Sequence, residues 1–320
     1  MRVSLFEPFV EVDLPLPDRH DGKVRSSWAL DGNRRLFVTT DRLSAFDRVI
    51  AGVPFKGQVL NQLAAWWFAR TADIVPNHVL EVPDPNALVA RAARPLPVEV
   101  VVRGYITGVT DTSLWAMYAA GARTVYGYEL PDGLRKNTPL PRHLVTPTTK
   151  ATHGGHDEPL SCADVVARGL LPADLWERVQ EAALAVFARG VAVAEAAGLI
   201  LADTKYEFGL ATGDDGEELL LIDEIHTPDS SRFWMADSYE QRLAAGEEPE
   251  SLDKEVVRRA FAELGYKGDG PVPTLPPETW SAAAGRYILA YERLTGERFV
   301  PGSYPVQARL TENLTKAGLL

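Results

Sequence analysis

Two runs of β-branched and apolar residues near the middle of the chain predict a β-hairpin. They cover residues 199–209 and 219–225, and residues 213–216 between them read Gly-Asp-Asp-Gly. Glycine and aspartate between two such runs are typical of the turn that joins antiparallel strands. Because side chains alternate along a strand, Lys205 and Glu207 are expected to share one face of the hairpin.

Two carboxylates of this hairpin are expected to face one another. If the turn is centred near Asp215, Glu207 lies opposite Asp223. Facing carboxylates repel each other unless a proton or a cation lies between them, and Mg²⁺ with phosphate oxygens in its shell is a natural occupant. Asp223 also lies among apolar residues, where a charge has to be paired or bound to metal. The alternative is a core hairpin with a Lys–Glu ion pair and no chemistry.

Polar segments near the hairpin add candidate ligands. Residues 227–234 form a polar loop with one cation, Arg232, whose planar guanidinium can hold a phosphate or carboxylate at two points. Residues 95–105 form a continuous apolar run, which predicts a strand buried on both faces. Arg103 at its end is then either an ion-paired core residue or an anion ligand. Residues 146–158 carry Lys, His and acids without periodicity, which predicts a long functional loop.

Two segments of the N-terminal third also have the composition of ligand-binding loops. Residues 22–25 read Gly-Lys-Val-Arg and precede a predicted strand over residues 35–40. A glycine followed by a basic residue between short strands can cover a polyphosphate, although a surface hairpin is the alternative. Residues 41–47 contain Ser44 and Asp47 and suit close approach by a ligand. Their alternative is a turn whose Asp and Ser bind local backbone.

The period of the apolar residues predicts five helices, over residues 59–71, 113–120, 172–197, 251–264 and 277–294. Ser251 is expected to cap the fourth helix, and Gly198 is expected to follow the end of the third. Residues 1–20 are rich in proline and predict an irregular lead-in. Residues 121–145 are turn-rich and predict an insertion or hinge.

Composition narrows the class of protein. With 320 residues, 46% of them hydrophobic and 24% charged, the chain can form one large or two modest soluble domains. A net charge of −11 argues against nucleic acid as the main partner. The single cysteine, Cys162, excludes an internal disulfide and a cysteine-built metal site. No apolar run approaches the roughly 20 residues that span a bilayer, and no signal peptide is visible, so we expect a cytoplasmic protein.

Taken together and in order, these segments resemble the SAICAR synthetase family (phosphoribosylaminoimidazole-succinocarboxamide synthase). The resemblance covers nearly the whole chain. It is carried by residues 22–25, 41–47, 97–108, 146–150, 156–158, 202–209 and 223–234.

The resemblance implies an α+β fold of two lobes with ATP between them. Residues 1–102 would form a small antiparallel β lobe similar to the N-lobe of a kinase, and residues 103–320 a larger α/β lobe with C-terminal helices. The implied activity is an ATP- and Mg²⁺-dependent ligation through an acyl phosphate. It joins the carboxylate of an aminoimidazole ribonucleotide (CAIR) to L-aspartate and gives SAICAR in de novo purine biosynthesis. The implied partners are small molecules, without nucleic acid or membrane, and the implied state is a monomer or homodimer.

The family's functional residues map onto positions of this sequence. The resemblance implies that Lys150, Lys205 and Asp223 are catalytic and that Glu207 and Asp223 bind Mg²⁺. It implies that ATP is bound by Gly22, Lys23, Val24, Arg25, Glu99 and Lys150. It implies that the substrates are bound by Ser44, Asp47, Arg103, Thr107, His156, Asp157, Lys205, Asp229, Ser231 and Arg232.

Three positions depart from the family's usual pattern, and all lie in expected ligand-facing loops. Ser26 follows Arg25 where an acid is usual, Val109 stands where a phosphate-binding serine is usual, and Thr138 follows Asn137 where glutamine is usual. Valine cannot donate a hydrogen bond. The departures leave two alternatives, namely a paralogue that amidates another nucleotide carboxylate, such as a C-nucleotide, in nucleoside natural-product biosynthesis, and a non-catalytic nucleotide-binding protein.

Overall fold

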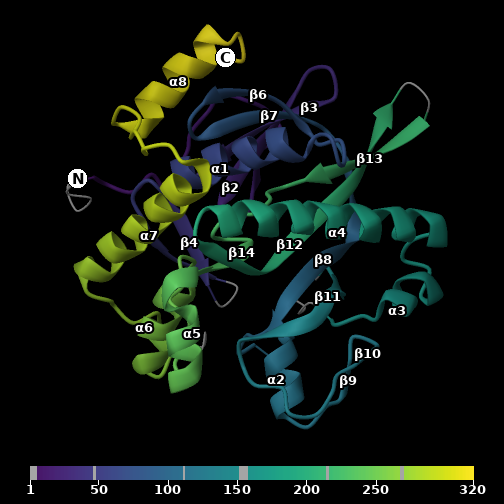
Figure 1. Ribbon diagram of the computed structural model, residues 1–320. Coiled ribbons are helices and arrows are strands. Elements are labelled where there is room, and N and C mark those ends of the chain that lie inside the picture. Colours follow the sequence, from purple (N-terminus) through teal and green to yellow (C-terminus); the bar gives the residue numbers. More distant parts are fainter. Residues whose placement is uncertain (1–5, 46–47, 111, 151–157, 214–215, 267–269) are drawn as a thin grey trace.

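The computed structural model describes residues 6–45, 48–110, 112–150, 158–213, 216–266 and 270–320. Two antiparallel sheets form the frame of the molecule, and helices cover the second sheet (Figure 1). Residues 6–19 contain no regular element, as the prolines of this segment predict. None of the helices within the described ranges is both long and apolar enough to cross a membrane.

The N-terminal sheet has five strands in the order β1-β2-β3-β7-β6. Their bounds are His20–Asp21 (β1), Arg25–Leu30 (β2), Arg34–Thr39 (β3), Val79–Asp84 (β6) and Ala87–Arg91 (β7). A separate ribbon of β4 (Arg42–Ala45) and β5 (Arg48–Gly52) follows β3. Residues 22–25, called the glycine segment below, connect β1 to β2. Its basic residues, Lys23 and Arg25, therefore lie at the β1 edge of this sheet.

The second sheet is built around two long strands, β8 and β12. Its order is β11-β8-β12-β13, and β14 pairs with the first part of β12. The bounds are Arg94–Ile106 (β8), Thr138–Thr149 (β11), Leu199–Gly213 (β12), Gly216–Ile222 (β13) and Ser231–Met235 (β14). The lobe boundary predicted at residue 102 falls within β8, and the division into two lobes stays a prediction.

The continuous apolar run of β8 predicts two buried faces, and this is wrong for one of them. Val98, Val100 and Val102 are fully buried, whereas Glu99 and Val101 on the opposite face are only half-buried. On that opposite face Glu99 is bonded to Lys205, whose side chain lines the cleft described below. A β-branched residue such as Val101 fits a half-buried strand face as well as a core, so the sequence pattern does not separate the two cases.

The five predicted helices are present with shifted bounds. They are α1 (Lys56–Thr71), α2 (Leu114–Ala119), α4 (Ala173–Ala196), α6 (Glu255–Glu263) and α7 (Pro277–Thr295). Gly198 follows α4 with a φ of 71°, as expected at this position. Ser251 does not cap α6, because the helix begins only at Glu255; Ser251 instead pairs with Trp234 in an isolated bridge. Three further helices were not predicted, namely α3 (Cys162–Ala167), α5 (Ala236–Ala245) and α8 (Val306–Lys316).

The prediction of a loop over residues 146–158 is wrong for its first part, because β11 continues to Thr149. Within the region predicted as an insertion, the short strands β9 (Thr124–Val125) and β10 (Tyr128–Glu129) precede β11. Three prolines, Pro139, Pro141 and Pro147, argued against a strand at β11 in the sequence. They are tolerated because β11 is an edge strand, whose outer side needs no hydrogen-bond partner.

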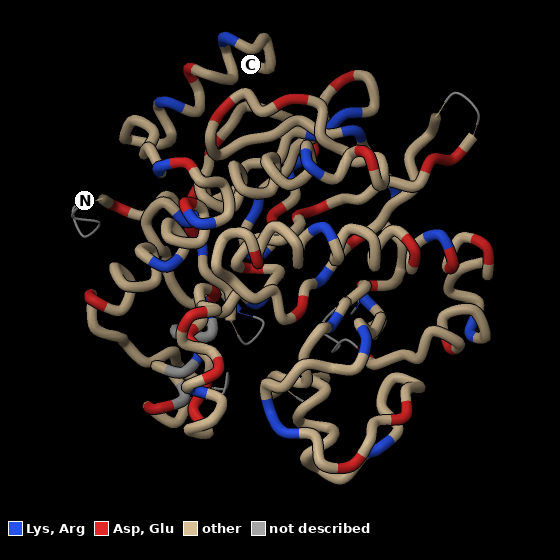
Figure 2. The backbone as a smooth tube through the Cα atoms, in the orientation of Figure 1, with Lys and Arg blue, Asp and Glu red and all other residues tan. Residues whose placement is uncertain are grey.

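The C-terminal helix α8 completes the core of the N-terminal sheet (Figure 1). Leu310 and Leu314 pack with Trp28, Leu36 and Val89 in one buried cluster. The main core lies between the second sheet and helices α1, α4 and α7. Figure 2 shows basic and acidic residues interspersed along the chain, without one continuous basic face in this view.

Candidate active site

A cleft of about 450 Å³ lies between the glycine segment of the N-terminal sheet and the β12–β13 hairpin. Nine residues predicted to bind or act on substrates line it, namely Gly22, Lys23, Val24, Arg25, Ser44, Lys205, Glu207, Asp223 and Asp229. These residues are up to about 200 positions apart in the sequence. The cleft is therefore the place where the predicted ligands converge.

The hairpin is present, but its register differs by one residue from the prediction. Glu207 lies opposite Ile222, not Asp223, because the turn is centred half a residue earlier than Asp215. Asp223 has already left β13 and has a positive φ of 66°. This turn of the backbone brings Asp223 to the same cleft as Glu207 by a different route.

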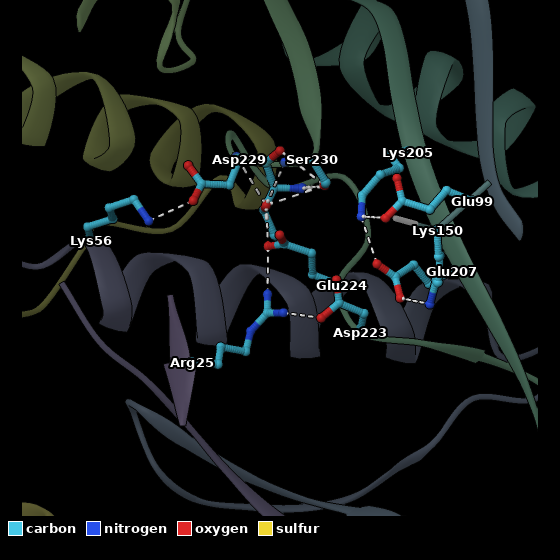
Figure 3. A network of polar contacts seen from close by, with 11 residues as sticks. Arg25, Lys56, Glu99, Lys150, Lys205, Glu207, Asp223, Glu224, Asp229 and Ser230 are labelled. Carbon is cyan, nitrogen blue, oxygen red and sulfur yellow. Dashed lines mark hydrogen bonds and ion pairs between the residues drawn. The ribbon is translucent and has the colours of Figure 1, made fainter. Parts of the chain in front are cut away.

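The carboxylate that does face Glu207 is Glu99, on β8. Lys205 lies between them, since its Nζ is 2.8 Å from Glu99 Oε1 and 2.7 Å from Glu207 Oε1 (Figure 3). Lys150 Nζ donates to the other oxygen of Glu207 at 2.5 Å. Burial opposes the ionisation of Glu207, but Lys205 and Lys150 outweigh it and lower its pKa to about 2. Glu207 is thus a fixed negative charge at physiological pH.

Asp223 is held by Arg25, which reaches across from β2. Arg25 bonds Asp223 through Nη1 and Glu224 Oε2 through Nη2 at 2.8 Å (Figure 3). Burial and the neighbouring carboxylates of Glu207 and Glu224 still raise the pKa of Asp223 to about 6 in spite of Arg25. A further cation close to Asp223 would favour its ionised form.

The glycine segment is held in a tight turn by its own neighbours. The Gly22 N–H donates to the Arg25 carbonyl at 2.8 Å, and the guanidinium of Arg42 donates to the carbonyls of Gly22 and Lys23. Ser26, which departs from the family pattern, donates its hydroxyl to Asp21 at 2.6 Å and closes the turn. This departure supports the loop that lines the cleft.

A second group of predicted ligands lies further along the same face of β12. Asp203 Oδ2 accepts from Arg103 at 3.4 Å and from Arg232, and Arg103 Nε donates to Thr146 Oγ1 at 2.8 Å. One carboxylate shared by two guanidiniums leaves the group with a net positive charge, so it can hold an anion. Asp203 and Lys205 are two residues apart on one strand, which places them about 7 Å apart.

The loop after β8 contains the position of the missing serine. Val109 is 61% exposed and follows Gly108, whose φ of 98° an L-residue rarely adopts. A Cβ at Gly108 would lie 3.5 Å from Arg232 Nη2, so the loop lies against the second group. Thr107 instead donates its hydroxyl to Asn137 Oδ1 at 2.7 Å and is buried.

Some of the residues predicted to bind substrates are hydrogen-bonded to other side chains of the protein. Asp229 accepts from Lys56 Nζ and from the Tyr287 hydroxyl, both at 2.6 Å, and Ser231 Oγ lies 2.7 Å from Thr204 Oγ1. The substrate roles expected for Asp229 and Ser231, and the ATP-binding role expected for Glu99, stay predictions. Asp47, His156 and Asp157 lie outside the described residues.

Four charged residues of the site were not predicted from the sequence. Lys254, which immediately precedes α6, and Arg258, on α6, both line the cleft. Glu224 shares Arg25 with Asp223, and Lys56 is fully buried against Asp229. The spacing of Lys254 and Arg258 could have been noticed, because residues four apart on a helix share one face. Within the described ranges, no three His, Cys, Asp or Glu side chains gather as a metal site.

Comparisons with known proteins agree with this geometry. A sequence model described as SAICAR synthetase matches residues 18–273. A protein of Mesorhizobium japonicum named putative phosphoribosylaminoimidazole-succinocarboxamide synthase 2 is 50% identical, over 94% of this chain and 96% of its own length. The phosphoribosylaminoimidazole-succinocarboxamide synthase of Legionella pneumophila (strain Lens) is 48% identical over 95% and 96%.

Solved structures show the same fold. The SAICAR-synthase of Saccharomyces cerevisiae complexed with SAICAR has a TM-score of 0.79 and 33% identity, and the match covers 92% of this chain and all of that one. A type-2 SAICAR synthetase in complex with ADP has a TM-score of 0.67 and 25% identity, with 89% and 100% covered. The predicted α+β architecture is therefore confirmed.

Proposed function

The chain belongs to the SAICAR synthetase family, and we propose that the cleft described above carries out the reaction of this family. The enzyme is an ATP-dependent ligase that joins the carboxylate of an aminoimidazole ribonucleotide (CAIR) to L-aspartate, giving SAICAR in de novo purine biosynthesis. One observation carries the residue assignment. Lys205, Glu207, Arg25 and Asp223 line a single cleft, next to the tight turn at Gly22.

Glu207 and Asp223 would hold Mg²⁺. Both carboxylates line the cleft, and a bound cation would offset the burial and the carboxylate repulsion that oppose the ionisation of Asp223. Mg²⁺ is usually bound by one or two carboxylates together with substrate phosphates, so a pair of acids is a sufficient protein contribution. When bound, the ion would neutralise charge on the transferred phosphoryl group.

ATP would lie under the turn formed by residues 22–25. Lys23 and Arg25 line the cleft from this turn, and Lys150 reaches it from the end of β11 through Glu207. Phosphoryl transfer depends mainly on positioning and charge neutralisation, which suits a cleft of lysines and arginines without a nucleophile triad.

The nucleotide would be anchored by its phosphate at Arg103 and Arg232. That position is about two residues along β12 from Lys205, so the reactive carboxylate would reach the ATP end of the cleft. Transfer of the γ-phosphoryl group to a carboxylate oxygen releases ADP and gives an acyl phosphate. The amine of aspartate then attacks the acyl carbon, phosphate leaves with the C–O bonding electrons, and the amine loses a proton.

Lys254 and Arg258 would bind the carboxylates of L-aspartate, the substrate that supplies the amine. Lys254 immediately precedes α6 and Arg258 lies on it, and both line the cleft together with Ser44 and Asp229. The cations assigned to ATP come from other elements of the chain. Lys254→Gln should therefore raise the KM for aspartate and leave the KM for ATP unchanged. A change confined to the KM for ATP would contradict this assignment.

The test of the function is a purified-enzyme assay with CAIR, aspartate, ATP and Mg²⁺, in which SAICAR, ADP and phosphate are all quantified. The expected result is equal amounts of the three products. Absence of SAICAR from an enzyme that still binds ATP would overturn the choice of CAIR and favour another nucleotide carboxylate.

A further inference from the structure

The hydroxyl of Tyr206 and the imidazole of His226 form a buried hydrogen bond directly beneath the cleft. The oxygen lies 2.8 Å from Nε2, and both side chains are 0% exposed. Tyr206 stands between Lys205 and Glu207 on β12 but points to the opposite face of the sheet. His226 belongs to the segment that follows β13 and carries Asp223. The bond therefore joins the two segments that supply the carboxylates of the cleft.

Three elements fix the position of the imidazole. The ring of Trp67 on α1 lies 4.6 Å from it, centroid to centroid, and the ring of Tyr206 on β12 lies 5.5 Å from it. Gly190 on α4 passes so close that a Cβ there would lie 2.0 Å from His226 Cε1. Glycine is unfavourable within a helix, so its presence at this contact indicates that space for the imidazole is the requirement.

Both members of the pair are neutral. Burial lowers the pKa of His226 to about 3, against the opposing effect of the Val186 carbonyl. Burial also raises the pKa of Tyr206 well above its usual range. The hydrogen bond between the Tyr206 hydroxyl and Nε2 therefore persists across the pH range in which an enzyme of this class acts.

The backbone between Asp223 and His226 needs side-chain contacts to hold its conformation. Asp223 and His226 both have positive φ values, 66° and 50°, a conformation that L-residues rarely adopt. Such conformations persist only when surrounding contacts determine them. Arg25 holds the side chain of Asp223, and Tyr206 holds that of His226.

We propose that Tyr206 and His226 are positioning residues, which set the place of Asp223 and Glu224 relative to Lys205 and Glu207. This inference rests on the proposed function of the cleft. The simpler interpretation is core packing alone, in which the aromatic contacts matter and the hydrogen bond does not. The two interpretations differ for a variant that removes only the hydroxyl.

The test compares Tyr206→Phe with Tyr128→Phe. Tyr128 also has a hydrogen-bonded hydroxyl, which donates to the Val145 carbonyl at 3.1 Å, but it is not among the residues that line the cleft. We expect Tyr206→Phe to lower kcat by about 10- to 100-fold, the scale of small misplacements of catalytic groups, and Tyr128→Phe to leave kcat unchanged. The affinity for Mn²⁺ with a non-hydrolysable ATP analogue, measured by electron paramagnetic resonance, should fall with Tyr206→Phe only.

Gly190→Ala provides a second test from outside the cleft. The added methyl group should displace the imidazole and reproduce the loss of kcat and of Mn²⁺ affinity, although alanine favours the helix. A third comparison decides the matter if those variants fail to fold. Glutamine at position 226 can place an acceptor near the Nε2 position and asparagine cannot, so His226→Gln should retain more activity than His226→Asn.

Three results would overturn the inference. They are a folded Tyr206→Phe with wild-type kcat and Mn²⁺ affinity, a folded Gly190→Ala with both values unchanged, and equal activity of the glutamine and asparagine variants. A wild-type enzyme that binds Mn²⁺ but makes no amide would instead count against the proposed function, and the Mn²⁺ comparison would still test the positioning pair.

Discussion

Replacing Lys56 by methionine tests whether Asp229 is a buried structural charge or an open ligand. Lys56 is fully buried at the first turn of α1, and its Nζ lies 2.6 Å from Asp229 Oδ2. The other oxygen of Asp229 accepts from Tyr287, which is also buried. Lys56 and Lys254 lower the pKa of Asp229 well below its usual range, although burial opposes this. Asp229 is therefore an ionised group that depends on Lys56.

Methionine matches the length and shape of lysine but removes its charge. Breaking a buried ion pair by removing one partner costs about 3–5 kcal/mol, because the other charge is left uncompensated. For 320 residues the entropy of unfolding is about 0.7 kcal/mol per degree, so Tm should fall by about 4–7 °C. Lys56→Met combined with Asp229→Asn should lose less than the sum of the two single variants, since neither charge then remains.

The assay is thermal unfolding followed by circular dichroism, with Lys316→Met as the matched control. Lys316 pairs with Glu312 at the surface, and both side chains are more than half exposed. The control should keep its Tm within about 1 °C of the wild type. A Lys56→Met variant as stable as the control would refute the reasoning. An Asp229→Asn variant with an unchanged Tm and a raised KM would favour the ligand role.

Two further predictions concern the substrate loop and the dependence of stability on pH. Val109→Ser should lower the KM for the nucleotide by about 10-fold, because a hydroxyl there adds a hydrogen bond to a charged phosphate; an unchanged or higher KM would count against the place of this loop. Burial raises the pKa of Asp41 from 3.8 to about 6, so its contribution to stability is fully present below pH 3.8 and is lost as the pH rises through 6. Asp41→Asn should therefore gain up to about 3 kcal/mol relative to the wild type between pH 4 and 7 in urea unfolding, and a constant difference would contradict the shift.

The sequence predicted the elements with strong periodicity and failed where tertiary context decides. The long apolar stripe of α4 and the hairpin of β12 and β13 were both predictable, because period and turn composition are local properties. The edge strand β11 was not, since its three prolines are compatible with a strand only at an edge. The helix α8 completes a core formed by residues near the other end of the chain, a contact that no local pattern reveals.

The residue types of the candidate site were predictable from the sequence, but the pairs of residues that contact one another were not. Lys205 and Glu207 were expected on one face, and they do share one. The half-residue shift in the turn places Ile222, and not Asp223, opposite Glu207 on β13. Glu99 faces Glu207 because β8 pairs with the other side of β12. The burial of Lys56 and the bond between Tyr206 and His226 depend on packing among elements far apart in the chain.

The central claim is that Glu207 and Asp223 hold the metal ion that makes ATP-dependent ligation possible. The most direct measurement is the rate of SAICAR formation by Glu207→Gln and Asp223→Asn, each of which removes a charge with almost no change in volume. The account predicts that both variants keep a near-native circular dichroism spectrum and lose at least about 100-fold in kcat, the scale for removing one group that stabilises transition-state charge. A folded variant of either kind with a rate close to that of the wild type would show that the metal is held elsewhere.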